Sequence, residues 1–360
     1  MRDAIYYWKC DRPTALSERD GVFRRNGDAV RLIPPLQELL ATSFPGPLQL
    51  EPALGSGNHH TFRLSHAQGK AFVRVESGLE GDGHLAVESH VLEAVARSGV
   101  AVPEVHFTDA TRQKVPFGVQ VLTLFDCPDL NRLHQQGQLP LLPTAFAIGE
   151  AIARWQSVPV SGFGPFQPNQ SGALKGHHSS YEAYFDLHLE RHIERLLFYN
   201  FLSQAEADDI RHEIDRHRSL LQLEQGVLVH KDLAFWNIMG TPDAIHAFVD
   251  WDDAIAGDPC DDLSLLACFY PIEAVVSAVE GYTAHRALPE EFDARFHLHL
   301  LRNLIVKALI RCQSGIFDRP EGGFFLLKAG ESGADLRAFT RQRLLSAHEG
   351  LKYGLPYAPL

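Results

Sequence analysis

The alternation of apolar and polar positions predicts a strand-rich unit in the first third of the chain. Thr61–Leu64 and the segment AFVRV that ends at Val75 alternate with the period of two that is typical of strands. Apolar residues then recur at helical spacing from Leu85 to Val95, and the continuous apolar run Phe117–Phe125 predicts another strand. We therefore expect an antiparallel sheet with one helix in a small lobe over residues 47–126.

The remainder of the chain, residues 127–360, has the pattern of a larger and mainly helical lobe. Apolar positions recur at helical spacing in four segments: Leu141–Gln156, Tyr181–Tyr199, Gln204–Leu221 and Leu301–Leu309. A short apolar run, Ile245–Val249, predicts a strand among these helices. The two patterns together indicate an α+β protein with two lobes.

Residues 1–46 fit neither pattern. Aromatic residues cluster there at Tyr6, Tyr7 and Trp8. Asn26-Gly27 has the composition of a turn, and Leu32–Leu40 predicts a short helix. We expect an arm packed on the small lobe, with a lid over the site or a dimer contact as the alternatives.

Composition and charge narrow the class of protein. The chain has 360 residues, of which 45% are hydrophobic, so it is long enough to bury two cores. A net charge of −12 argues against nucleic acid as the default partner and is compatible with a cationic substrate. Five scattered cysteines, no apolar leader and no run of about 18 apolar residues favour a cytoplasmic protein without a membrane span.

The candidate chemistry is concentrated between residues 229 and 262. The polar residues there follow a fixed order: His230, Asp232 and Asn237 in HxDxxxxN spacing, Asp250 after the predicted strand, and a GDPCDD turn. Phosphoryl transfer needs a base for the acceptor hydroxyl and oxygen ligands for a metal ion. Asp232 is the candidate base, and Asn237 and Asp250 are candidate Mg²⁺ ligands, because this cation prefers oxygen. We expect His230 to brace the loop.

These motifs resemble those of a known family. HKDLAFWN and VDWDDAIAGDPCDDLSLLA are similar to the HGDL....N and IDW..A..GDP..DLA patterns of the aminoglycoside phosphotransferase and choline kinase-like family. The resemblance implies a protein kinase-like two-lobed fold with the site in the cleft, ATP and Mg²⁺ as cofactors, and a small-molecule hydroxyl as acceptor. Lys231 stands where the family has glycine, and Phe235 with Trp236 makes the loop bulkier.

The resemblance also gives roles to the GDPCDD turn and to the small lobe. It implies that Asp262 braces the catalytic loop, while Asp258 is expected to cap the helix that follows. Gly55 and Gly57 precede a strand and not a helix, so they predict a glycine hairpin over phosphates and not a dinucleotide-binding turn. A plain hairpin turn is the alternative.

Arg74 and Phe72 share one face of their strand. Arg74 is the candidate ligand of the ATP phosphates, and Phe72 is placed to stack on adenine; a half-exposed arginine and a core phenylalanine are the alternatives. Glu88, on the inward side of the predicted helix, is the candidate partner of Arg74. The backbone around Val121 and Leu122 would then read the adenine edge.

The leading interpretation is ATP-dependent transfer of the γ-phosphoryl group to a hydroxyl of an aminoglycoside, sugar or amino alcohol. An inactive nucleotide-binding pseudokinase and a kinase-fold nucleotidyltransferase are the alternatives. The presence of Asp232, Asn237 and Asp250 argues against the first of these. A protein kinase is disfavoured because Asp250-Trp251 replaces the DFG motif. The sequence predicts no oligomeric state.

Overall fold

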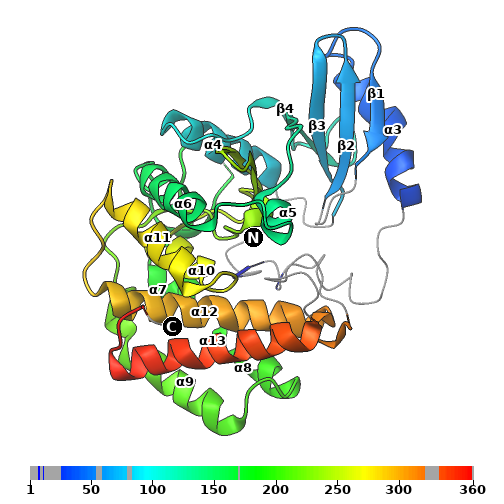
Figure 1. Ribbon diagram of the computed structural model, residues 1–360. Coiled ribbons are helices and arrows are strands. Elements are labelled where there is room, and N and C mark those ends of the chain that lie inside the picture. Colours follow the sequence, from blue (N-terminus) through cyan, green and yellow to red (C-terminus); the bar gives the residue numbers. More distant parts are fainter. Residues whose placement is uncertain are drawn as a thin grey trace.

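The computed structural model describes residues 7–8, 11, 26–53, 59–78, 83–168, 171–320 and 332–358. In this part of the chain, an antiparallel sheet lies beside a larger, mainly helical body (Figure 1). The predicted boundary at residue 126 falls between the last strand of that sheet and the first helix of the body. The predicted α+β class is therefore confirmed.

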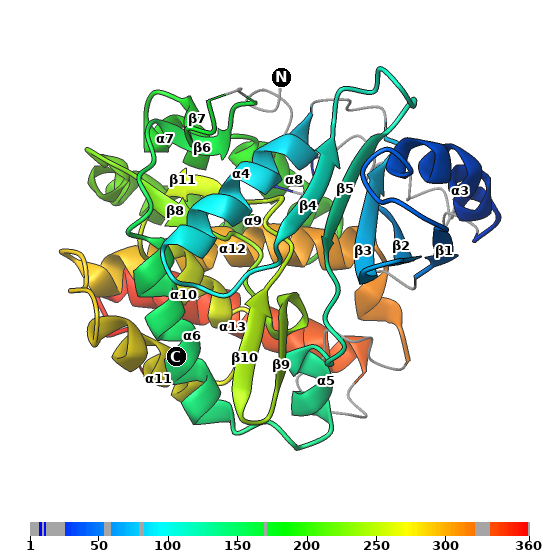
Figure 2. The same ribbon diagram turned by 90° about the horizontal axis from the view of Figure 1, so that it is seen from above.

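The small lobe contains a five-stranded antiparallel sheet in the order β1-β2-β3-β5-β4. Its strands are β1 (Gln49–Pro52), β2 (His60–His66), β3 (Gly69–Glu76), β4 (Val105–Asp109) and β5 (Gly118–Thr123). Helix α4 (His84–Arg97) packs against β4 and β5, and helix α3 (Asn26–Leu40) lies beside β1 (Figure 2). The sheet and its inward helix match the pattern predicted from the sequence.

Helix α3 is longer than predicted. It begins at Asn26, so the expected turn at Asn26-Gly27 is wrong, and it contains both Pro34 and Pro35. Proline removes a backbone donor from a helix interior. The leucines that follow are buried in the core of the sheet, which offsets that cost. This part of the N-terminal extension is the arm on the small lobe that the sequence predicts.

The large lobe is mainly helical. Its helices are α5 (Leu130–Gln135), α6 (Leu141–Trp155), α7 (Tyr181–Phe185), α8 (Leu189–Phe198), α9 (Gln204–Arg216), α10 (Asp261–Leu266), α11 (Ile272–Thr283), α12 (Phe292–Gln313) and α13 (Gly333–Tyr353), with 3₁₀ turns at Arg218–Leu221, Phe235–Asn237 and Ile316–Asp318. Among the described residues, no helix has both the length and the apolar character needed to cross a bilayer.

Short strands carry residues 229–262, the segment with the candidate chemistry, through this lobe. They are β6 (Phe163–Phe166), β7 (Gly176–His178), β8 (Val227–Val229), β9 (Ile238–Thr241), β10 (Ala244–Phe248) and β11 (Ile255–Gly257). Four of them form a sheet in the order β7-β6-β11-β8, while β9 and β10 form a hairpin. The predicted helix Tyr181–Tyr199 is divided into α7 and α8, because His188 has a left-handed backbone with φ of 58°.

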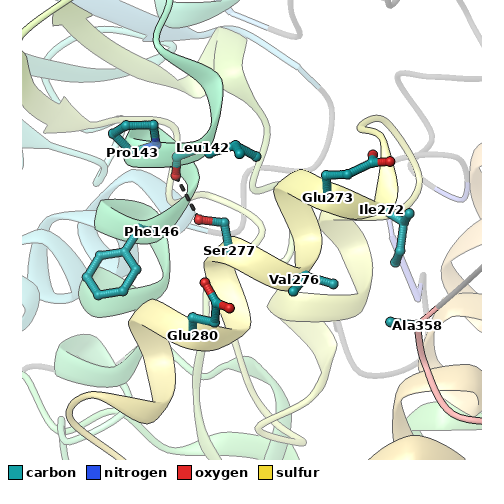
Figure 3. A pocket seen from close by; sticks show the side chains of 9 residues that line it. All are labelled: Leu142, Pro143, Phe146, Ile272, Glu273, Val276, Ser277, Glu280 and Ala358. Atoms are coloured by element: carbon teal, nitrogen blue, oxygen red, sulfur yellow. Dashed lines mark hydrogen bonds between the residues drawn. The ribbon is translucent and has the colours of Figure 1, made fainter.

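Helices α6 and α11 approach each other closely because each has a glycine at their crossing. A Cβ on Gly149 would lie 1.8 Å from the Ala278 carbonyl oxygen, and one on Gly281 would lie 2.0 Å from that of Phe146. Beside this crossing is a groove of about 890 Å³ (Figure 3). It is lined by Leu142, Pro143, Phe146, Ile272, Glu273, Val276, Ser277, Glu280 and Ala358, all of which lie outside residues 229–262.

We predict that Gly149→Ala lowers the free energy of unfolding by about 2 to 3 kcal/mol, because the new methyl group meets backbone atoms that cannot rotate away. Urea denaturation measures the loss. Gly118→Ala is the matched control, since the closest atom to its Cβ would be the end of the Leu85 side chain, at 3.2 Å, and backbone would lie no closer than 3.7 Å. Equal losses in the two variants would mean that α6 and α11 have room to separate.

Candidate active site

The loop from His230 to Asn237 connects β8 to β9, and Asp262 at the start of α10 holds it in place. Asp262 Oδ2 accepts the His230 backbone N–H at 2.8 Å, and Oδ1 accepts that of Lys231 at 3.0 Å. His230 Nε2 donates to the Val249 carbonyl at 3.0 Å, which ties the loop to the end of β10. Burial raises the pKa of Asp262 to about 7. His230 and Asp262 therefore brace the loop as expected.

The GDPCDD turn differs in one detail from the expectation. The sequence predicts that Asp258 caps the following helix, but the residue at the N-cap of α10 is Cys260, and no side chain caps it. Asp258 Oδ1 instead accepts the Cys260 N–H at 2.8 Å, and Oδ2 pairs with Arg295 at 2.7 Å. Asp258 thus anchors the turn to α12.

Asp232 is held by contacts on both of its carboxylate oxygens. Lys307 Nζ donates to Oδ1 at 2.9 Å, and Asn237 Nδ2 donates to Oδ2 at 3.1 Å. Asn237 Nδ2 also donates to the Asp232 carbonyl at 2.8 Å. The amide nitrogen of Asn237 is therefore turned toward Asp232 and its oxygen away, which leaves that oxygen as the atom that can meet a cation.

The β9–β10 hairpin brings Asn237 beside Asp250. Ile238 pairs with Phe248 at the base of the hairpin, and the Val249 N–H donates to the Asn237 carbonyl at 2.9 Å. Asp250 has a left-handed backbone with φ of 65°, a conformation that non-glycine residues rarely adopt and that recurs at functional sites. Amide and carboxylate oxygens are the ligands that Mg²⁺ prefers, so these two residues fit that ion.

Arg74 joins the two lobes at a buried cluster of charges. Its Nη1 lies 2.5 Å from both carboxylate oxygens of Glu88, and its Nη2 lies 3.2 Å from Asp250 Oδ1. Glu88 Oε1 also accepts the backbone N–H of Trp251 at 3.1 Å. Burial raises the pKa of Glu88, and Arg74 opposes that shift. The structure thus places Arg74 and Glu88 together, as the strand and helix periods predict.

The residues predicted to surround adenine lie on neighbouring strands. Phe72 on β3 pairs with Leu122 on β5, and the next pair contains Val121. Phe72 is half-buried, whereas Val121 and Leu122 are buried. Gly55 and Gly57 lie outside the described residues. The nucleotide-binding roles of all five residues stay predictions.

The sequence reasoning missed an N-terminal segment and a lysine at the catalytic loop. Tyr7 and Trp8 are buried and contact residues of the large lobe, so the expected arm on the small lobe is wrong for them. Trp8 Nε1 donates to Asp253 Oδ2 at 2.8 Å, and the centre of its ring lies 3.5 Å from Lys307 Nζ. A lysine inside the apolar stripe predicted at Leu301–Leu309 was the available signal.

Lys231, which replaces the glycine of the family pattern, is linked to the same segment. Its backbone has φ of 69°, the left-handed region in which glycine is favoured. Its buried Nζ lies 2.7 Å from Asp261 Oδ2, 3.0 Å from the Tyr7 hydroxyl and 3.0 Å from Asn303 Oδ1. The side chain of Lys231 therefore anchors Tyr7 beneath the catalytic loop.

A small lobe with an antiparallel sheet, an arginine–glutamate pair between strand and helix, and a catalytic loop in a helical lobe together define a protein kinase-like fold. The sequence model of the phosphotransferase enzyme family matches residues 51–297, which is more than half of the chain. The chain belongs to this family.

Solved structures of small-molecule phosphotransferases share the fold. A ternary complex of a thermostable mutant of the aminoglycoside phosphotransferase APH(4)-Ia with AMP-PNP and hygromycin B is 17% identical, with a TM-score of 0.61 over 87% of this chain and 98% of that one. The macrolide 2'-phosphotransferase MphH from Brachybacterium faecium is 16% identical, with a TM-score of 0.51 over 86% and 97%. No curated protein sequence matches the chain significantly.

We predict that Lys231→Gly lowers the free energy of unfolding by about 2 kcal/mol, although the backbone there favours glycine. Loss of one partner of a buried ion pair costs about 3 to 5 kcal/mol, while relief of the left-handed backbone returns about 1 to 2 kcal/mol. Urea denaturation measures the difference. Asp261→Asn in the same background should recover part of the loss, and a more stable Lys231→Gly variant would refute the account.

Proposed function

We propose that the protein transfers the γ-phosphoryl group of ATP to a hydroxyl group of a small molecule, with Mg²⁺ as the metal ion. The observation that carries this proposal is a continuous set of contacts. Asp232 contacts Asn237, Asn237 contacts Val249 next to Asp250, and Asp250 contacts Arg74 of the small lobe. Family membership supports phosphoryl transfer to a small molecule. The related aminoglycoside phosphotransferase, crystallised with AMP-PNP and hygromycin B, supports a nucleotide donor and a hydroxylated acceptor.

In the proposed reaction, the acceptor hydroxyl oxygen attacks the γ-phosphorus, and the bond from that phosphorus to the β–γ bridging oxygen breaks. ADP leaves with the electron pair of that bond, and the hydroxyl proton passes to the Asp232 carboxylate. Lys307 and Asn237 fix the orientation of this carboxylate through the contacts on its two oxygens. Positioning of this kind supplies much of the catalysis in phosphoryl transfer.

The other residues act on the phosphates. Asn237 and Asp250 would hold Mg²⁺, which neutralises phosphate charge when it is bound. Arg74 would grip the phosphates through a charge-assisted contact, and Glu88 would keep its guanidinium in place. Phe72 and the backbone of β5 would contact adenine, and Gly55 and Gly57 would cover the phosphates.

The acceptors to assay first are those that the family resemblance implies, namely aminoglycosides, sugars and amino alcohols. A cytoplasmic location is part of the proposal. It is supported by cysteines that remain unpaired among the described residues: Cys127, Cys260, Cys268 and Cys312.

We predict that Asp232→Asn lowers turnover at least about 100-fold, because it removes the proton acceptor and keeps the shape of the side chain. Its affinity for ATP should stay within about twofold of wild type, since the base meets the acceptor and not the nucleotide. Calorimetry measures the affinity, and ADP release in the presence of an acceptor measures turnover. Normal turnover in the variant would show that Asp232 is not the base.

We predict that Arg74→Ala weakens ATP binding roughly 30- to 150-fold, the equivalent of about 2 to 3 kcal/mol for a charge-assisted contact. Glu88→Ala should have a smaller effect, because it only frees the guanidinium to move. The double variant should lose less than the sum of the two losses, since both belong to one network. Arg97→Ala, at an exposed position in the last turn of α4, is the matched control. Additive losses would indicate that Arg74 and Glu88 act separately on the nucleotide.

A further inference from the structure

Two cationic side chains project from one face of α12 beside the proposed base. Lys307 Nζ, which contacts Asp232, lies 4.9 Å from the centre of the Phe269 ring. The Arg311 guanidinium carbon lies 5.6 Å from the centre of the same ring. Lys307 and Arg311 are four residues apart, so their Cα atoms are separated by one helical turn, about 6 Å. The second cation is therefore near the first, but one turn farther from Asp232 along the helix.

A third cation comes from α13. Arg311 Nη1 donates to Thr340 Oγ1 at 2.7 Å, and Arg343 follows Thr340 on the same face of that helix. Burial raises the pKa of the Cys268 thiol to about 12. The positive charges of Arg311, Lys307 and Arg343 act against that increase. Lys307 and Arg311 thus both lie beside the Phe269 ring, and Arg311 contacts the helix that carries Arg343.

Their charges are unevenly compensated. Lys307 pairs with Asp232, but no carboxylate of the described residues makes an ion pair with Arg311 or Arg343. Burial lowers the pKa of Arg311 to about 10 and also lowers that of Arg343. Arg343 is only 9% exposed, and within the described chain its Nη1 has no hydrogen-bond partner.

Buried cations without a counter-charge are costly, and proteins normally pair them. Asp261, in the same lobe, shows the usual arrangement, because it neutralises the buried Lys231. Arg311 and Arg343 form no such ion pair: Arg311 donates to Thr340 Oγ1 at 2.7 Å and to the Cys268 carbonyl at 3.5 Å, and Arg343 is attracted by Glu273 without an ion-pair contact. A bound anion would supply the missing charge, and a guanidinium binds an oxyanion with two parallel donors.

We propose that the acceptor carries an oxyanion, such as a carboxylate or phosphate group, that binds at Arg343 and Arg311 while its hydroxyl lies at Asp232. This inference rests on the proposed phosphoryl transfer and names the substrate class. The separation of about one helical turn suits a small hydroxy acid or a phosphorylated sugar. The net charge of the chain led to the expectation of a cationic acceptor, whereas the cations beside the base favour the opposite sign.

Sulfate is the probe for this site, because its binding can be measured without turnover. Sulfate should raise the melting temperature of the wild-type protein. The concentration that gives half of the effect should rise at least about tenfold in Arg343→Met and less in Arg343→Lys, which keeps the charge. Arg337→Met is the matched control on the same helix, since its guanidinium is satisfied by the Asn200 carbonyl at 2.8 Å, and it should respond like wild type.

Without sulfate, Arg343→Met should be at least as stable as wild type, because it removes a buried charge that forms no ion pair with a described residue. A stability loss in this variant, or a sulfate response equal to that of wild type, would overturn the proposal. The proposal would also be overturned if saturating ADP and Mg²⁺ abolished the sulfate response, because sulfate would then occupy the site of the nucleotide phosphates.

Turnover separates this inference from the proposed function. Hydroxy acids should be phosphorylated at least about tenfold more efficiently than diols of the same length, and Arg343→Met should remove that preference. If the protein phosphorylates uncharged or cationic acceptors, and Arg343→Met leaves their turnover unchanged, the proposal of an anionic acceptor would be wrong. Phosphoryl transfer itself would still hold. A sulfate response that depends on Arg343, without ATP turnover by the wild type, would keep the anion site and overturn phosphoryl transfer.

Discussion

The buried guanidinium of Arg74 connects the parts of the molecule on which the proposed chemistry depends. It contacts Glu88 from α4 and Asp250 from the end of β10, while Glu88 also accepts the Trp251 N–H. Removing such charges from water costs several kcal/mol for each ion, and only good geometry on both sides returns it. Because β3 belongs to the small lobe and β10 to the large one, the cluster fixes how the lobes meet. From Asp250 the contacts continue through the hairpin to Asn237, Asp232 and Lys307.

The strand and helix periods, together with the family resemblance, predict the Arg74–Glu88 pair of this cluster, whereas the contact of Arg74 with Asp250 was not predicted. The strand period places Arg74 on the inward face, the helix period places Glu88 opposite, and the hairpin length places Asn237 beside Asp250. Each of these inferences concerns residues that lie in the same strand or helix, or within the next one or two strands or helices along the chain. Trp8 and Asp253, by contrast, are 245 residues apart in the chain, and no local pattern encodes their contact. The same limit explains α3, where burial in the sheet core overrides the helix-breaking tendency of two prolines.

The departures from the family pattern occur in the loop that carries the proposed base. Lys231 replaces glycine and anchors Tyr7 beneath the loop. Phe235 stacks on Tyr270 with ring centres 3.8 Å apart, and Trp236 meets Phe269 edge-on at 4.8 Å. The residues proposed for the phosphates, in contrast, keep the spacing of the family. In the proposed function, this division separates the residues for the phosphates from those that would face the acceptor.

The most direct test of the central claim is the mass of the product. The protein would be incubated with ATP, Mg²⁺ and a pool of small hydroxylated molecules. The mass of each molecule would be measured by mass spectrometry before and after the incubation. The account predicts that one acceptor gains the mass of a single phosphoryl group while ADP appears in equal amount. A gain of a whole nucleotide, or bound ATP with no product from any acceptor in the pool, would contradict it.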